Sequence, residues 1–369
     1  MSIVQYKKIG SLSLLKFFLA FITFLFHMYI HFSVVYKAKL INKFICDGAF
    51  AMSGFFILSG FLLYYIYSQK SFSDFEYMKN FYIKRLIKVL PSAYFVTIIM
   101  YLFSRLVLHT SVNWTILIMQ FIPMQAFFPH LFGKFLNGWM WFVSVLLFLY
   151  FLFPLLCFVV KSIKHIYLFA ITVYLLGIFP LMVNCYYPTF SLYHLPSFRI
   201  CEFIMGMITA KILLLTKNNI KNAELFVLLT SLAIFFGISL LHSNNFFNHV
   251  SFCLSYMNYD LILLILFPML IYFLSVAKNK YFLLIMQSKV IDYLGKISYA
   301  FFITQMISFF IVSNYFKPNN YFGLSSTAIL FVSFVLNMVF AILMYEIFEK
   351  NLSNWLIGKF IRTCSSSDR

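Results

Sequence analysis

Long apolar runs recur along almost the whole of this 369-residue chain. Ten of them are close to 20 residues long, which is the length that an α-helix needs to cross the hydrocarbon core of a membrane. They cover residues 14–36, 48–67, 89–108, 138–160, 166–185, 199–216, 224–242, 257–276, 294–315 and 324–347. Charged residues make up only 10% of the chain, whereas soluble proteins contain roughly 25%. The sequence therefore predicts an all-α polytopic membrane protein with about ten transmembrane helices.

The Lys and Arg residues are distributed unevenly between the two sides of a membrane crossed ten times. Twenty of the 28 lie at the termini and in the even-numbered loops, seven lie on the other side, and Lys16 lies inside the first run. Cytoplasmic loops carry such an excess of positive charge. The distribution predicts that both termini are cytoplasmic. It also explains the net charge of +18 without a nucleic-acid partner.

Outside the ten runs, the sequence shows no pattern typical of a second domain. Residues 114–128 are apolar but short, and Pro123 and Pro129 lie near their end, which indicates an interfacial or re-entrant piece. The first run is too long for a signal peptide and has no cleavage site, so it should be retained. The six cysteines show no metal-type spacing. We expect one integral-membrane domain over residues 1–369, with its core at about 8–360, no appended soluble domain and no metal.

Two ionisable residues in the first apolar run, Lys16 and His27, are eleven positions apart. Eleven positions are about three helical turns, so both side chains would project from one face, roughly 16 Å apart along the axis. Ionisable residues in hydrocarbon are costly and usually mark function, and an imidazole exchanges protons near neutral pH. The alternative is structural: Lys16 would extend to the lipid headgroups, and His27 would hydrogen-bond a neighbouring helix.

A basic segment precedes the third apolar run. Lys84, Arg85 and Lys88 have the spacing i, i+1 and i+4, so Lys84 and Lys88 share a helix face. Such a face could hold a polyanionic ligand such as a nucleotide diphosphate. The alternative is an ordinary positively charged anchor that binds anionic lipid headgroups.

Two patterns favour contacts between helices. In the second run, Gly54, Ser59 and Gly60 would let another helix approach closely. Arg199 and Glu202 are one turn apart at the outer end of the sixth run, where an ion pair would lower the cost of burying either one. The spacing does not decide whether this pair also contacts a substrate.

The remaining acidic residues support other functions poorly. Glu346 and Glu349 close the tenth run, where a solvated helix end is the simplest interpretation. Asp260, near the outer end of the eighth run, is the main candidate for proton-coupled transport. The sequence contains no phosphate-binding GxxxxGK[ST] loop, no GxSxG nucleophile elbow and no HExxH metal pair. No two runs are broken at matching positions, as they are in many secondary transporters.

Seven short motifs follow one another along the chain. They are Lys16…His27, Phe55-Phe56-Ile57-Leu58-Ser59-Gly60-Phe61, Arg85-Leu86-Ile87-Lys88 with Pro91, Trp141-Phe142-Val143-Ser144-Val145 with Pro154, Arg199-Ile200-Cys201-Glu202-Phe203-Ile204-Met205-Gly206, Leu294-Gly295-Lys296-Ile297-Ser298-Tyr299 and Glu349-Lys350. Taken in this order, the motifs resemble those of the membrane-bound acyltransferase-3 family, which includes O-acetyltransferases of bacterial surface polysaccharides. The resemblance covers about residues 8–360, essentially the whole chain.

The chain also departs from the pattern of that family. Lys16 and Lys88 replace Arg, which keeps the charge but loses the planar fork that grips phosphate or carboxylate. Ser53 and Leu146 stand where many members have Asp and Glu, and Gln305 stands where His is common. These departures suggest a divergent branch, in which His27 is retained.

The resemblance implies an O-acyltransferase of the bacterial cytoplasmic (inner) membrane, with acetyl as the expected group. Acetyl-CoA would be a cytoplasmic co-substrate rather than a bound cofactor. The acceptor would be a hydroxyl of a surface carbohydrate, such as lipopolysaccharide O-antigen or exopolysaccharide, or of its lipid-linked precursor. The alternative is a carrier or flippase for an acyl group or a lipid-linked sugar, without transfer chemistry.

Roles for individual side chains follow from the same resemblance. His27 would act as a general base on the attacking hydroxyl, or would accept the acyl group itself as a nucleophile. The residues expected to bind the donor are Lys16, Lys84, Arg85 and Lys88. Candidates on the acceptor side are Arg199 and Glu202, and the structural motif comprises Phe55, Phe56, Ser59 and Gly60.

Overall fold

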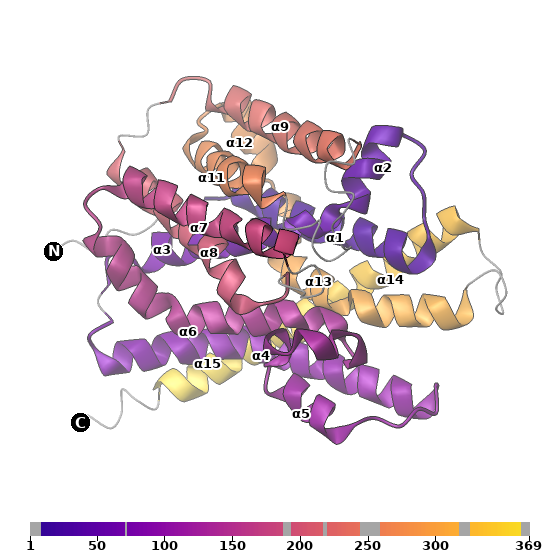
Figure 1. Ribbon diagram of the computed structural model, residues 1–369. Helices are drawn as coiled ribbons and strands as arrows, with labels where there is room; N and C mark the ends of the chain where they lie inside the picture. The colour runs from indigo at the N-terminus through magenta and orange to yellow at the C-terminus, as the bar shows by residue number, and fades with distance from the viewer. Residues whose placement is uncertain are drawn as a thin grey trace. The chain divides into compact units, whose positions relative to one another are not determined.

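The computed structural model describes residues 9–70, 72–186, 193–216, 220–243, 259–316 and 325–362. Within these ranges the chain forms α-helices, short 3₁₀ turns and one π-helical segment, and no strand occurs in them (Figure 1). The all-α part of the prediction is therefore confirmed for the residues described.

A helix occupies most of each of the ten apolar runs. These helices are α1 (Leu12–Phe32), α3 (Ala51–Tyr67), α4 (Phe75–Leu106), α6 (Trp141–Ser162), α7 (Ile166–Tyr186), α8 (Pro196–Leu215), α9 (Ala223–Ser243), α11 (Asp260–Val276), α13 (Lys289–Tyr315) and α14 (Ser326–Met344). Shorter elements lie between and after them: α2 (Lys39–Cys46), η1 (Gly48–Phe50), α5 (Trp114–Phe121), η2 (Gln125–Phe127), η3 (Pro129–Lys134), η4 (Gly138–Met140), α12 (Lys280–Met286), the π-helix η5 (Tyr345–Leu352) and α15 (Ser353–Arg362).

Seven helical stretches in the described ranges are long and apolar enough to cross a membrane. They are Leu12–Phe32, Gly48–Tyr67, Phe75–Leu106, Gly138–Ser162, Ala223–Leu241, Lys289–Tyr315 and Ser326–Ile361. An eighth results if α11 and α12, which meet at a bend of 109°, form one broken span. Helix α8 carries three charged side chains, Arg199, Glu202 and Lys211, which lower its apolar character. A multi-pass protein is thus established, while ten spans with cytoplasmic termini stay a prediction.

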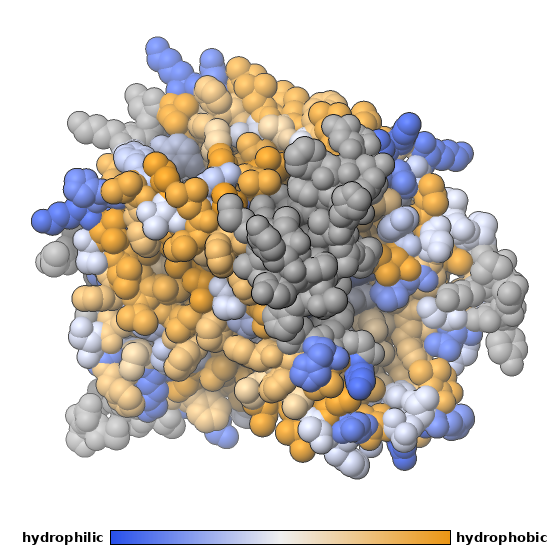
Figure 2. Space-filling model, viewed as in Figure 1, coloured by the Kyte–Doolittle hydropathy of each residue, from blue (hydrophilic) through white to orange (hydrophobic). Residues whose placement is uncertain are grey.

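Large hydrophobic side chains are exposed on several of these helices. Figure 2 shows apolar residues over large parts of the visible face. On α6 and α7 they include Phe151, Leu155, Phe158, Leu168 and Phe179, each more than half exposed. Soluble proteins rarely expose contiguous apolar surface of this extent. Contact with lipid hydrocarbon explains this exposed apolar surface, because side chains that face lipid are not in contact with water.

The chain divides into two compact units, each built from separate segments of sequence. Residues 1–26, 35–70 and 152–296 belong to the first unit, and residues 27–34, 71–151 and 297–369 to the second. Because Lys16 and His27 fall on either side of the first boundary, the first unit contains Lys16 and the second contains His27. The expected single domain stays a prediction.

In the first unit, α3 and α8 pack at very short range. A Cβ atom on Gly60 of α3 would lie 1.9 Å from the Phe203 carbonyl oxygen, and one on Gly206 of α8 would lie 1.8 Å from the Ile57 carbonyl oxygen. No side chain fits at either position. The predicted close approach at Gly60 is therefore present, and it fixes the spacing of the two helices that carry Ser53, Arg199 and Glu202.

In the second unit, α4, α13 and α14 are held together by aromatic and polar contacts. Phe103 of α4 stacks on Phe310 of α13 with ring centroids 4.8 Å apart. Between α13 and α14, Thr304 donates to the Asn337 side chain at 2.9 Å, and the Asn337 amide donates to the Phe301 carbonyl oxygen at 3.0 Å. These buried hydrogen bonds fix the rotation of α13, and therefore determine the direction in which Gln305 points.

Candidate active site

His27 lies near the end of α1 and is buried, with a relative exposure of 8%. Its Nδ1 atom is 2.9 Å from Oε1 of Gln305 on α13. Because an amide oxygen can only accept a hydrogen bond, Nδ1 carries the hydrogen and Nε2 carries the lone pair. The ring is thus held in the tautomer and orientation in which Nε2 is the basic atom.

An aromatic wall holds the other side of the imidazole. The Trp139 indole stacks on His27 with ring centroids 4.0 Å apart and planes inclined by 4°. Phe309, one turn after Gln305 on α13, meets the indole edge-on at 5.5 Å. His31, one turn beyond His27, is exposed and lies 6.1 Å from it. The rings of His27, His31, Trp139 and Phe309 thus lie close together. Of the two imidazoles, His27 is the one that is buried and hydrogen-bonded to Gln305.

The segment before α6 holds the Trp139 indole in position. The Asn137 side chain accepts a hydrogen bond from the Trp139 backbone N–H at 3.2 Å, which starts the short helix η4. The Gln120 side chain, from α5, donates to the Asn137 carbonyl oxygen at 3.3 Å. The short apolar stretch after residue 113 is therefore the support for Trp139, a role that its sequence did not indicate.

The basic segment lies inside α4, which begins sixteen residues before Pro91 and continues beyond it. Lys84 and Lys88 are exposed on one face, as their spacing predicts, and Arg85 is partly buried. The Arg85 guanidinium lies over the Phe81 ring at 5.6 Å and near the Tyr150 ring at 5.9 Å. The aromatic contacts restrict this side chain while the two lysines remain accessible.

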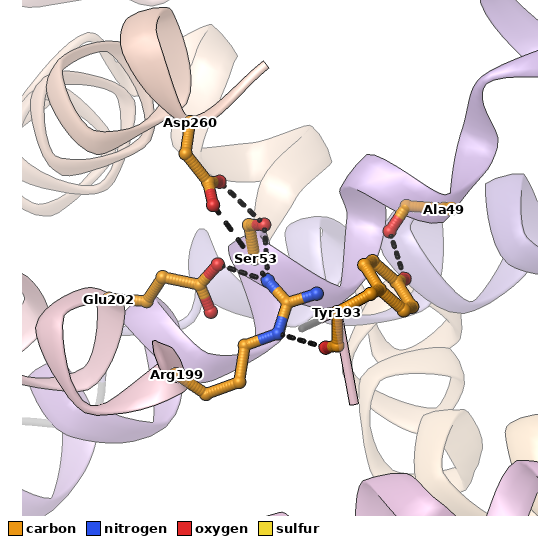
Figure 3. Close-up of polar contacts among 6 residues, drawn as sticks. All are labelled: Ala49, Ser53, Tyr193, Arg199, Glu202 and Asp260. Carbon is orange, nitrogen blue, oxygen red and sulfur yellow. Dashed lines mark hydrogen bonds and ion pairs between the residues drawn. The ribbon is translucent and has the colours of Figure 1, made fainter. Parts of the chain in front are cut away.

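Arg199 and Glu202 are buried at 1% exposure rather than lining an outer opening. They form the predicted ion pair, and Asp260 of α11 and Ser53 of α3 complete the cluster (Figure 3). The Ser53 hydroxyl donates to Asp260 Oδ1 at 3.0 Å and accepts from Arg199 at 3.3 Å. Arg199 Nε also donates to the Tyr193 carbonyl oxygen at 2.9 Å. Arg199 and Glu202 thus have polar partners within the protein.

One departure from the family pattern, Ser53, lies in this cluster. Where many members have Asp, this chain has Ser53, and its hydroxyl contacts the Asp260 carboxylate. A carboxylate from α11 therefore lies beside position 53, 4.0 Å from Arg199. Two carboxylates, those of Glu202 and Asp260, therefore lie around the one guanidinium of Arg199.

One correction concerns the tenth run. Glu349 is buried at 9% exposure, so the expectation of a solvated helix end is wrong for this residue. The reason is that η5 winds as a π-helix, which packs against α4 and turns Glu349 inward. Glu346 is partly exposed and pairs with Lys350 at 2.6 Å, as the spacing i, i+4 favours.

His194 precedes α8 and lies within electrostatic range of Arg199. Burial and the positive charge of Arg199 lower the pKa of His194 from 6.5 to about 3. The folded state therefore keeps this imidazole neutral at a pH where the unfolded chain has already bound a proton.

We expect His194 to make the protein acid-labile. Its contribution to the free energy of unfolding is unaffected above pH 6.5 and becomes increasingly unfavourable as the pH falls from 6.5 towards 3. In His194→Asn, melting temperatures in detergent at pH 7.5 and pH 5 should therefore differ less than in the wild type. An equal difference in both proteins would assign the acid lability to other groups.

In the described ranges, no group of His, Cys, Asp or Glu could hold a metal ion. Cys46, Cys157 and Cys201 are unbridged. The side chains of Cys185, Cys253 and Cys364 lie outside the described residues.

The fold and this site define a multi-pass helical membrane protein with a buried, oriented histidine. The chain belongs to the acyltransferase-3 family, because the family model described as an acyltransferase domain matches residues 9–346. Comparison with curated proteins and with solved structures gives no significant match. The chain is therefore a membrane acyltransferase, as its motifs predict.

Proposed function

We propose that this acyltransferase moves an acetyl group from cytoplasmic acetyl-CoA to a hydroxyl of a bacterial surface carbohydrate. The observation that carries the proposal is the buried imidazole of His27, with Nδ1 anchored by Gln305 at 2.9 Å and its face covered by Trp139. A fixed imidazole with a basic Nε2 is the group that hydroxyl activation requires.

In this mechanism, His27 Nε2 takes the proton of the acceptor hydroxyl. The hydroxyl oxygen attacks the thioester carbon, the new C–O bond forms, and the C–S bond breaks. The leaving thiolate takes up the proton that His27 accepted, so the imidazole is neutral again and the products are the ester and free CoA. In the alternative, Nε2 attacks the thioester carbon first, the C–S bond breaks and CoA leaves as the thiolate; the acceptor hydroxyl then attacks the acyl-imidazole, the C–N bond breaks, and the hydroxyl proton goes to the thiolate.

The donor's phosphates are assigned to the basic face of α4. Lys84 and Lys88 supply exposed charge, and Arg85 supplies a guanidinium restricted by Phe81 and Tyr150. Guanidinium and ammonium groups bind phosphate by charge-assisted hydrogen bonds. Lys16, partly buried on α1, is proposed to steer the donor.

Arg199 and Glu202 receive a structural role in this proposal instead of an acceptor contact. Both are buried and have partners within the protein, including Ser53 and Tyr193. A sugar could reach them only if the cluster opened.

The test is proton NMR of the surface polysaccharide from a strain lacking this protein, complemented with the wild-type chain. An O-acetyl signal that returns with the chain is the expected result. Purified protein mixed with acetyl-CoA and the de-acetylated polysaccharide should then form the ester. If the signal returns in cells but the purified chain forms no ester, the chain is a carrier for another enzyme.

A further inference from the structure

Two cavities adjoin in the first unit, and every described residue that lines them belongs to that unit. Their volumes are about 410 Å³ and about 370 Å³, and ligand sites in proteins measure roughly 300–1,000 Å³. Ser11, just before α1, and Leu274 of α11 line both cavities. The Ser11 hydroxyl donates to the Leu274 carbonyl oxygen at 2.6 Å, so this hydrogen bond marks the boundary between the two.

The smaller cavity is almost entirely apolar. It lies among α1, α2, η1, α9, α11 and α12, and its wall includes the side chains of Phe18, Phe44, Phe235, Phe267 and Leu270. Phe18 is 44% exposed, so the wall of this apolar cavity reaches the surface of the protein. Such a wall favours hydrocarbon over water.

The larger cavity has a polar wall at the break between α11 and α12. Ser275, Lys278 and Gln287 line it, and they carry a hydroxyl, an ammonium group and an amide. Among the described residues that line this polar cavity, Lys278 is the one charged residue and none is acidic. A polar cavity with a positive charge thus adjoins an apolar one, as the head and the chain of an anionic amphiphile require.

Hydrogen bonds hold the backbone at this break, where α11 and α12 meet at 109°. The Glu224 side chain of α9 accepts from the backbone N–H groups of Lys278 at 2.8 Å and Asn279 at 2.7 Å. The Asn279 side chain in turn accepts from the N–H groups of Tyr281 and Phe282, which starts α12. The backbone of Lys278 is therefore fixed at the polar cavity, while Glu224 does not line it.

We propose that the two cavities together bind one anionic phospholipid, with its phosphate beside Lys278 and an acyl chain in the apolar cavity. A single cation suits a head group with one net negative charge, such as that of phosphatidylglycerol. Phosphatidylethanolamine also carries an ammonium group, for which the described residues that line the polar cavity offer no carboxylate.

The predicted topology agrees with this ligand. The N-terminus and the loop that contains Lys278 are both predicted to be cytoplasmic, so the lipid would enter from the cytoplasmic leaflet. Anionic lipids give that leaflet its negative surface potential. The inference does not depend on the proposed acyl transfer.

The test is titration of the purified full chain in detergent with dioleoylphosphatidylglycerol or dioleoylphosphatidylethanolamine, with bound lipid counted by native mass spectrometry. One phosphatidylglycerol molecule should bind about fivefold more tightly than phosphatidylethanolamine, because the chains are identical and only the head groups differ. Lys278→Gln should lower the affinity for phosphatidylglycerol about fivefold, the effect expected of one lysine, and leave the affinity for phosphatidylethanolamine nearly unchanged. Lys278→Met removes the same charge and serves if the first variant does not fold.

The matched control is Lys280→Gln. Lys280 is exposed, lies two positions further along and lines neither cavity, so its replacement should change both affinities less than about twofold. The apolar cavity is tested by Ser231→Phe on α9, which adds a ring at an exposed position of the wall. This ring should weaken the binding of both lipids to the same extent, because it occupies the space of the chain.

Three results would overturn the proposal. Equal affinity of the wild type for the two lipids, or equal binding of phosphatidylglycerol by Lys278→Gln and Lys280→Gln, excludes the head-group site. Unchanged lipid binding by Ser231→Phe excludes the apolar cavity as the place of the chain. Glycerol 3-phosphate carries the phosphate without chains, so its displacement of the lipid at equimolar concentration would assign the polar cavity to a free phosphate ligand instead.

Discussion

Replacing His27 by Gln should lower kcat for acyl transfer by about 10²–10⁴-fold, the contribution typical of a positioned general base. The substitution keeps a polar side chain of similar size in the buried site, so the fold should be retained. The measurement is ester formation by purified protein at saturating acetyl-CoA. Because Gln cannot take a proton, KM for the donor should change much less than kcat.

The matched control for His27 is His31→Gln, on the same helix one turn further along. His31 is exposed, and His27 is the imidazole bonded to Gln305, so His31→Gln should lower kcat less than about tenfold. Equal losses of kcat in the two variants would show that the reaction does not depend specifically on the His27 imidazole, and would refute its assignment as the general base.

Two additions refine this experiment. Denaturing the protein at near-neutral pH during turnover with radiolabelled acetyl-CoA should leave it unlabelled if His27 is a base and labelled if His27 is a nucleophile, whereas acid would hydrolyse an acyl-imidazole. If Gln305 acts only through His27, then Gln305→Leu should reduce kcat in the wild-type background. It should cause no further loss in His27→Gln.

Replacing Arg199 by Met should destabilise the folded protein by about 3–5 kcal/mol, because it leaves Glu202 and Asp260 buried without their cation. The expected readout is a large fall in melting temperature in detergent, together with loss of monodisperse protein. Asp260→Asn is the contrasting variant. It removes one of two carboxylates and leaves the ion pair of Arg199 with Glu202, so its effect should be much smaller.

These variants also decide between a structural and an acceptor-binding role. Arg199→Met with an unchanged melting temperature and a selective rise in KM for the acceptor would contradict the structural assignment. In that case the buried cluster would have to open during turnover, and the acceptor would take the place of one of its present partners.

Much of the architecture follows from short-range pattern alone. A run of about 20 apolar residues has few alternatives to a helix in lipid, and the structure has a helix over most of each of the ten runs. The ion pair of Arg199 with Glu202 could also be predicted, because both lie on one turn of one helix. The packing at Gly60 followed from its lack of a side chain.

The site itself depended on contacts that no local pattern contains. Gln305 is separated from His27 by 278 positions, and only the rotation of α13 brings its amide to the imidazole. The presence of Gln305 where His is common in the family was the one available signal in the sequence. Trp139 lies two residues before the Trp141 motif, and nothing in its spacing distinguishes it. The inward turn of Glu349 depends on a π-helix that the sequence does not predict.

The stack of Trp139 on His27 has an optical consequence. An indole emits light, and an imidazolium or acyl-imidazole held 4.0 Å from its face is a quencher at contact distance. The chain has four tryptophans, so a variant that keeps only Trp139 would carry its own reporter beside the reacting nitrogen. Each protonation or acylation of the ring would then appear as a change in emission, and the reaction could be followed in real time without a labelled substrate.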